Sequence, residues 1–369
     1  MYILSLLPGT VPAAGSGTKT ASSGRQAAGG NDEIPQAQKK QEVFVINHQI
    51  AKELGIGPRQ VENTVKLLDD GNTIPFIARY RKEATGELDE NVIREISERL
   101  TYLRSLEARK EEVIRIVAEQ EKLTPELAAA IRAATRLQEV EDLYRPYRPK
   151  RRTRASVARE KGLEPLAETM LAQDVPGNDY AGAAAFVEAA AAPFVNPDAG
   201  VATVDEALSG AKDIIAETVA DDAETRKILR RLTFQKGYLA TQPKDMKKES
   251  APVYEMYYEY REPVNRIPPH RVLAVNRGER EEVLAVKIDV AEEDMVLPVR
   301  QKWVKNNGSL WSPHVDEAVR DAYKRLIQPA IGRDIRNELT EKSEEQAIKV
   351  FSANLRNLLL QPPVRGKTV

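Results

Sequence analysis

The sequence predicts a mainly α fold, an elongated array of helices with one minor β element around residues 253–304. From Asn47 onward, apolar residues recur mostly at the spacing of three and four residues that is typical of amphipathic helices. Signals for helix starts recur along the same stretch. Only one region, rich in tyrosine and β-branched residues, departs from this pattern. The length of 369 residues allows two or three domains.

The helical elements follow in order along the chain. One apolar stripe of a helix consists of Ile93, Ile96, Leu100 and Leu103. Three sites have the composition of helix starts, namely Asp89, Thr124-Pro125 and Ser312-Pro313. Thr124-Pro125 would open a helix over 127–137, and residues 343–360 keep apolar positions in helical register. We therefore expect helices from the start of the ordered chain to its end.

The β element is expected between residues 253 and 290. Residues 253–260 alternate with a period of two, and residues 283–290 are β-branched, so both are predicted strands. Residues 269–278 between them predict a short helix that Gly278 ends, with a hairpin strand as the alternative.

Charge is segregated along the chain, although 55 Lys+Arg and 56 Asp+Glu leave a net charge of only −1. Residues 144–161, the basic strap, contain eight basic residues and one acidic residue, a net charge of +7. Residues 174–224, the acidic block, contain eleven acidic residues and one basic residue, a net charge of −10. The near-zero total thus conceals two opposed blocks.

The basic strap has the composition of a phosphate-binding segment. Its prolines disfavour a helix and predict an extended chain. Arginine suits phosphate oxygens and tyrosine suits base stacking. The candidates for phosphate contact are Arg145, Arg148, Lys150, Arg151, Arg152 and Arg154, and those for stacking are Tyr144 and Tyr147. The alternative is a structural strap whose arginines pair with the acidic block and whose tyrosines pack between helices.

Residues 49–61 fit a helix-turn-helix motif. Ala51 is small where two helices would approach, Gly55 suits the positive φ of the turn, and Val61 would pack against the first helix. Arg59 and Gln60 would then open a recognition helix and reach base edges. The alternative is an αα-hairpin without DNA contact. Residues 72–86, which follow, indicate a helix-to-loop transition with an exposed basic end.

Enzymatic function is not predicted. The chain has no cysteine, and its three histidines, His48, His270 and His314, have no metal-ligand neighbour at helical spacing. No phosphate-loop, dinucleotide-binding or serine-nucleophile motif occurs. We therefore predict no catalytic residue, no metal ligand and no cofactor. No apolar run approaches the ~20 residues of a membrane span.

Three blocks of sequence together resemble the Tex family, bacterial transcription accessory proteins with an S1 RNA-binding domain. They are NTIPFIARYRKEATG at 72–86, DLYRPYRPKRRTR at 142–154 and AREKGLEPL at 158–166. The resemblance runs from Asn47 to the last residue. It implies a helical N-terminal region with a helix-turn-helix-like unit, ending where an RNase H-like domain would begin and before the S1 domain.

These observations predict a non-enzymatic transcription accessory protein that binds nucleic acid, RNA or DNA. One alternative is a helical scaffold that binds proteins and no nucleic acid. Another is a sequence-specific helix-turn-helix regulator. We expect a cytoplasmic monomer that meets RNA or DNA and the transcription or translation machinery, with no membrane and no small-molecule substrate. The expected divisions are a disordered tail 1–41, a helix-turn-helix-like unit 42–86, a helical region 87–250, a mixed segment 251–304 and C-terminal helices 305–369.

Overall fold

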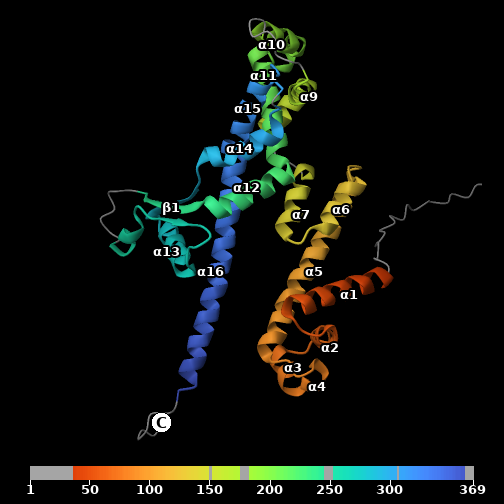
Figure 1. The fold of residues 1–369 in the computed structure, drawn as a ribbon, viewed down its shortest axis with the longest axis vertical. Coiled ribbons are helices and arrows are strands. Elements are labelled where there is room, and N and C mark those ends of the chain that lie inside the picture. The colour runs from red at the N-terminus through yellow and green to blue at the C-terminus, as the bar shows by residue number, and fades with distance from the viewer. Residues whose placement is uncertain (1–35, 149–151, 175–182, 245–251, 306, 362–369) are drawn as a thin grey trace, which may run out of the picture. The chain divides into compact units, whose positions relative to one another are not determined.

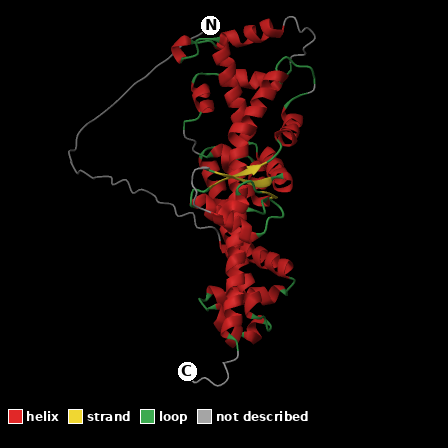
Figure 2. Ribbon diagram, turned by 90° about the vertical axis from the view of Figure 1, so that its left-hand side faces the viewer, coloured by secondary structure: helices red, strands yellow, loops and turns green. Residues whose placement is uncertain are grey.

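The computed structural model describes residues 36–148, 152–174, 183–244, 252–305 and 307–361 (Figure 1). These residues are mainly helical, as predicted, with one small antiparallel sheet (Figure 2). The chain divides into two compact units, an N-terminal unit (Met1–Arg104) and a C-terminal unit (Ser105–Val369), and the division falls inside helix α5 (Glu90–Glu119). The finer division into five segments stays a prediction. Most of the predicted tail lies outside the described residues, but residues 36–41 begin helix α1, so disorder is not found there.

The N-terminal unit is built from short helices around one apolar core. Its helices are α1 (Gln36–Leu54), α2 (Pro58–Asp69), α3 (Ile74–Tyr80), α4 (Lys82–Thr85) and the first part of α5. The predicted stripe of α5 is confirmed, and its four residues are buried. Asp89 caps α5 as predicted, because its Oδ1 accepts hydrogen bonds from the backbone N–H groups of Asn91 and Val92 at 2.8 and 2.9 Å. Local capping and periodicity therefore place this helix.

Two ion pairs give the N-terminal unit a pH dependence. The hydrogen bond from Arg99 lowers the pKa of Glu53 below 4.5, and that from Arg104 lowers the pKa of Asp69 below 3.8. A carboxylate with a lowered folded-state pKa stabilises the fold above its unfolded pKa, and this contribution is lost as pH falls through the folded pKa. We expect the unit's free energy of unfolding to fall as pH drops below 4.5, by up to ~1 kcal/mol per pair because the pairs are partly exposed.

Glu53→Gln should flatten this acid-side fall. Urea unfolding followed by far-UV circular dichroism at a series of pH values measures it. Identical pH profiles for the variant and the parent chain would contradict the assignment to Glu53.

The C-terminal unit begins with a small helical layer. It contains the end of α5, α6 (Pro125–Ala133) and α7 (Leu137–Tyr144), which bury a separate apolar cluster. The Thr124 side chain caps α6 as predicted by accepting from the N–H of Leu127 at 3.2 Å. The predicted helix over 127–137 ends early, because Ala134 is extended and a second helix starts at Leu137.

Helix α11 (Val204–Asp221) is central to the large core of the C-terminal unit. It packs against α8 (Arg154–Glu160), α9 (Glu164–Ala172), α10 (Ala183–Ala191) and α15 (Ser312–Asp321). Its small residues allow this close packing, since a Cβ at Gly210 would lie 2.4 Å from Leu163 Cδ1. Two short 3-10 turns, η3 (Ala192–Phe194) and η4 (Pro197–Ala199), connect α10 to α11.

The sheet has the strand order β2-β1-β3, with both pairings antiparallel. The predicted strand over 283–290 is confirmed as β3 (Leu284–Asp289), whereas β1 (Tyr238–Pro243) and the short β2 (Arg261–Pro263) were not predicted. The strand predicted over 253–260 is wrong, because this stretch forms a 3-10 helix, η5 (Pro252–Tyr257). Tyr254 and Tyr257 are both buried, which is the spacing of three that a 3-10 helix provides.

A glycine inside α13 (Pro269–Arg280) corrects a predicted helix end. The helix is confirmed, but it continues past Gly278 for two residues. Gly278 is buried, and a Cβ there would lie 2.6 Å from Leu284 Cδ1. Close packing against β3, and not a helix end, therefore explains this glycine.

A nearly continuous helical rod ends the described chain. Helix α12 (Ala223–Lys236) and α14 (Glu292–Trp303) precede it, and α15 leads through a π-helical segment, η6 (Ala322–Ile327), into the long α16 (Gln328–Leu359). Proline at position 329 cannot donate to the preceding turn and would clash with its carbonyl, so the wider turn before it is the expected accommodation. The helix predicted over 343–360 is confirmed as the second half of α16, whose residues from 344 onward are exposed.

Candidate nucleic-acid interface

The basic strap is less extended than its prolines predicted. Tyr144 ends α7, and Arg145–Tyr147 form one turn of 3-10 helix, η1, because the fixed φ of Pro146 suits such a turn. Lys150 and Arg151, both predicted phosphate contacts, lie outside the described residues. The chain then enters α8, which Thr153 caps by accepting from the N–H of Ser156 at 3.0 Å.

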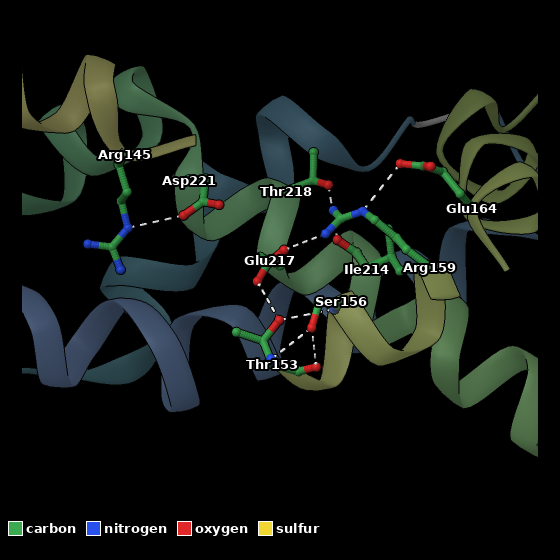
Figure 3. Close-up of polar contacts among 9 residues, drawn as sticks. All are labelled: Arg145, Thr153, Ser156, Arg159, Glu164, Ile214, Glu217, Thr218 and Asp221. Carbon is green, nitrogen blue, oxygen red and sulfur yellow. Dashed lines mark hydrogen bonds and ion pairs between the residues drawn. The ribbon is translucent and has the colours of Figure 1, made fainter. Parts of the chain in front are cut away.

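The acidic block neutralises both ends of the strap (Figure 3). Glu217 and Asp221 lie one turn apart on α11 and so share a face. Arg145 Nε lies 3.1 Å from Asp221 Oδ1, and Arg159 Nη1 lies 2.6 Å from Glu217 Oε2. The ion pair of Arg145 with Asp221 is the kind of contact that the structural alternative expects.

The ion pair between Arg159 of the strap and Glu217 is partly buried. Glu217 is 7% exposed and also accepts a hydrogen bond from Thr153 Oγ1 at 3.0 Å. Desolvation by burial would lower the pKa of Arg159, but its hydrogen bond and ion pair with Glu217 outweigh this and raise the pKa. Arg159 thus holds α8 against α11 and is not available to a phosphate.

Both tyrosines of the strap pack against the apolar cluster of α5, α6 and α7. Tyr144 is 6% exposed in the cluster formed by α5, α6 and α7, and the guanidinium groups of Arg109 and Arg148 lie 5.3 and 5.5 Å from its ring centroid. The Tyr144 ring therefore has little surface open to solvent, and its stacking on bases stays an untested prediction. Tyr147 is half-buried against the same cluster, and its carbonyl accepts from Gln120 Nε2 at 3.0 Å.

The middle of the strap stays open to solvent. Arg148 is exposed but pairs with Glu141. Arg152 lies 3.7 Å from Glu160, and both side chains are mostly exposed. Arg154 is exposed, and among the described residues it has no ion-pair partner. It also sits in the first turn of α8, where the helix dipole disfavours a cation, so its charge serves no evident local purpose.

The predicted helix-turn-helix segment consists of α1, a turn and α2. Gly55 has φ +67°, the left-handed conformation expected of the turn glycine, and Val61 and Ala51 are buried in the same core. Arg59 is exposed. Gln60 Oε1 accepts from the N–H of Gly57 at 3.0 Å, and Gln60 Nε2 donates to the carbonyl of Gly86 at 2.9 Å. These two hydrogen bonds give Gln60 a structural role, and base contact by Gln60 stays an untested prediction.

A buried ion pair between α7 and α12 was not predicted from the sequence. Arg226 of α12 donates from Nε to Asp142 Oδ1 at 2.7 Å, and its side chain is 3% exposed. Asp142 lies two residues before the first residue of the strap, but its partner is 84 residues away. No local pattern indicates such a pairing.

We also searched the described residues for metal sites and for membrane-spanning helices. Within the described ranges, histidine and acidic side chains nowhere gather in threes that could hold a metal ion. No described helix combines the length and apolar composition needed to cross a membrane.

Comparisons with known proteins match two regions of the chain. Residues 44–118 match the family model for the Tex-like protein N-terminal domain, and residues 184–351 match the model described as Tex central region-like. The chain is 49% identical over 326 residues to the uncharacterized protein YdcI of Bacillus subtilis, covering 88% of this chain and 44% of that protein.

Two further relatives carry descriptive names. The transcriptional accessory protein Tex of Neisseria gonorrhoeae is 38% identical over 329 residues, 86% of this chain and 41% of that protein. The human S1 RNA-binding domain-containing protein 1 is 30% identical over 339 residues, 87% of this chain and 32% of that protein. The chain spans less than half the length of these relatives.

Proposed function

Because the chain belongs to the Tex family, we propose that it is a non-enzymatic transcription accessory module that binds RNA or DNA through the open middle of its basic strap. The relatives' names, transcriptional accessory protein and S1 RNA-binding domain-containing protein, support a role associated with nucleic acid. The proposal includes a cytoplasmic monomer that works beside the transcription or translation machinery.

One observation carries the assignment to the strap. Arg152 and Arg154 stay exposed while Arg145 and Arg159 on either side pair with the acidic block. The two paired arginines hold the strap in place, and the exposed ones can donate to phosphate oxygens. The pairing also explains how a strongly acidic neighbour on α11 need not repel a nucleic acid, since its nearest carboxylates are neutralised.

Removing the two exposed arginines should lower the salt dependence of binding. Each phosphate contact contributes about 0.7 (single strand) to 0.9 (duplex) to the slope of log affinity against log salt. We expect Arg152→Ala with Arg154→Ala to reduce this slope by about 1.4 to 1.8. Fluorescence anisotropy of labelled RNA and DNA oligonucleotides over a range of salt concentrations measures the change.

A control variant distinguishes an effect of the strap arginines on the salt slope from an effect of the total charge of the chain. Arg266 and Arg333 are exposed and have no ion-pair partner among the described residues, so Arg266→Ala with Arg333→Ala removes the same charge elsewhere. The slope should stay closer to that of the parent chain. An equal reduction by both double variants would mean that the strap has no special role.

A second candidate function, a protein-binding scaffold, is favoured by the exposed end of α16. The exposed large apolar residues of this end are Ile348, Val350, Phe351, Leu355, Leu358 and Leu359, and Leu360, which directly follows the helix, is exposed as well. Such residues are typical of surfaces that meet other proteins. Absence of oligonucleotide binding by the parent chain at low salt would favour this scaffold over the nucleic-acid proposal. The third hypothesis is a sequence-specific regulator. The Gln60 amide, which would read bases in such a regulator, forms hydrogen bonds with the backbone of Gly57 and Gly86.

A further inference from the structure

The junction of α3 and α4, residues 79–84, gathers basic side chains without acidic partners. We call it the α3–α4 corner. Arg79, Arg81 and Lys82 are exposed, and among the described residues none of them has an ion-pair partner. The arginines of α5 in the same unit, by contrast, each pair with a carboxylate: Arg94 with Glu90, Arg99 with Glu53 and Arg104 with Asp69. The corner therefore presents cationic charge that the unit itself does not neutralise.

An exposed aromatic ring stands among these cations. Tyr80 is 67% exposed, and its ring centroid lies 5.3 Å from that of Phe76, with the planes tilted by 43°. The guanidinium carbon of Arg81 lies 5.4 Å from the centroid of the Phe76 ring. Phe76 thus supports Tyr80 and Arg81 together. A tyrosine ring that is supported from within and open to solvent is a stacking platform for an unpaired base.

Helix α2 holds the backbone of the corner in place. Asn63 Nδ2 donates to the carbonyl of Ala84 at 2.8 Å, and Gln60 Nε2 donates to that of Gly86 at 2.9 Å. Gly86 has φ +69°, and a Cβ there would lie 2.7 Å from Gln60 Nε2, so the approach needs glycine. These contacts pre-organise the corner, which lowers the entropy cost of binding a ligand. They also give Gln60 a positioning role next to the exposed Arg59.

The corner is hollowed and almost free of negative charge. The residues that line the hollow are Arg79, Tyr80, Arg81, Lys82, Glu83 and Ala84. Glu83 is the one carboxylate in this lining. Basic side chains around an exposed aromatic ring are the combination that single-stranded nucleic acid requires, because phosphates and unpaired bases are then met together.

We propose that the α3–α4 corner is a binding site for single-stranded nucleic acid. In this site Tyr80 stacks on a base, and Arg79, Arg81 and Lys82 contact the flanking phosphates. A duplex is disfavoured because its bases are already stacked on one another and offer no face to Tyr80. The inference deepens the proposed function, on which it rests for the class of ligand.

The test uses the full chain and a labelled oligouridylate, with oligodeoxythymidylate of the same length as the DNA arm. Tyr80→Ala should weaken binding of both single strands by about 5- to 160-fold, the range expected for the loss of one stacked base. Tyr80→Phe should bind as the parent chain does, because phenylalanine keeps the ring. Arg79→Ala with Lys82→Ala should reduce the salt slope by about 1.4.

Controls keep the result specific to the corner. Tyr102 on α5 is 36% exposed and lies outside the corner, so Tyr102→Ala should leave affinity unchanged. Binding to a duplex of the same length should not respond to Tyr80→Ala. An unchanged affinity for single strands in Tyr80→Ala, or an equal loss in Tyr80→Phe or Tyr102→Ala, would overturn the proposal. Far-UV circular dichroism checks that each variant keeps its helices.

The outcomes also separate this inference from the proposed function of the strap. If Tyr80→Ala weakens binding while Arg152→Ala with Arg154→Ala does not, the corner stands and the strap assignment fails. If only the strap variant weakens binding, the corner inference fails. If the parent chain binds neither single strand at low salt, the corner inference is overturned, and the strap assignment is overturned as well if the chain does not bind the duplex.

Discussion

Arg226→Ala is expected to lower the free energy of unfolding of the C-terminal unit by about 3–5 kcal/mol. The Arg226 side chain is 3% exposed and lies between Asp142 of α7 at 2.7 Å and Asp334 of α16 at 3.5 Å. Removing the guanidinium leaves Asp142, itself 7% exposed, as a buried carboxylate without its cation. The large cost arises from that uncompensated charge and not from the strength of the pair alone.

Tryptophan fluorescence during urea unfolding measures this effect. The chain has two tryptophans, Trp303 and Trp311, and both lie in the C-terminal unit. Arg277→Ala, which breaks an exposed pair with Glu281 in the same unit, should leave the free energy of unfolding close to that of the parent chain. Arg226→Met combined with Asp142→Leu should cost less than Arg226→Ala, since it leaves no buried charge. A loss of under ~1 kcal/mol in Arg226→Ala would show that water reaches Asp142.

Ile50→Ala is expected to destabilise the N-terminal unit by about 2–5 kcal/mol. Ile50 is fully buried in the core that joins α1 to α2, α3 and α5, so truncation leaves a cavity where the two helices of the helix-turn-helix segment meet. The apolar core of this unit is separate from that of the C-terminal unit. We therefore expect the loss to appear in one unit only.

Two probes distinguish a local from a global effect. Far-UV circular dichroism should report an unfolding transition at lower urea concentration in Ile50→Ala, while the tryptophan fluorescence transition stays where it is in the parent chain. Phe44→Ala, on the same helix but 62% exposed, should change stability by no more than ~0.5 kcal/mol. Equal shifts of both probes in Ile50→Ala would mean that the two units unfold together.

The helices were predictable where their signals are local. Asp89 and Thr124 cap the helices that they were expected to cap, and the stripe from Ile93 to Leu103 is buried as its spacing predicts. These signals act within one or two turns of backbone, so they do not depend on the rest of the fold. The strand predicted for the tyrosine-rich stretch before β2 was wrong. In so short a segment, the period of two typical of a strand cannot be told from the spacing of three typical of a 3-10 helix.

The candidate site was predictable only as a set of residue types. The sequence indicated arginines and tyrosines that suit nucleic acid in the strap, and for residues 72–86 only a helix-to-loop transition with an exposed basic end. It could not indicate that Tyr144 is buried and Tyr80 is open, because burial depends on which helices pack above each ring. Nor could it indicate that the side-chain amide of Gln60 forms hydrogen bonds with the backbone of both Gly57 and Gly86.

The sequence by itself therefore determined the helical class, several helix starts, the opposed charge blocks and the family blocks. Each of these depends on neighbours in the chain. Only the tertiary structure decided which charges remain available. Asp221 pairs with Arg145, 76 residues away, and Asp142 pairs with Arg226, 84 residues away. Arg154 and the basic residues of the α3–α4 corner stay exposed. The physical reason is that an ion pair depends on proximity in space, which the packing of α7, α11 and α12 creates and sequence spacing does not reveal.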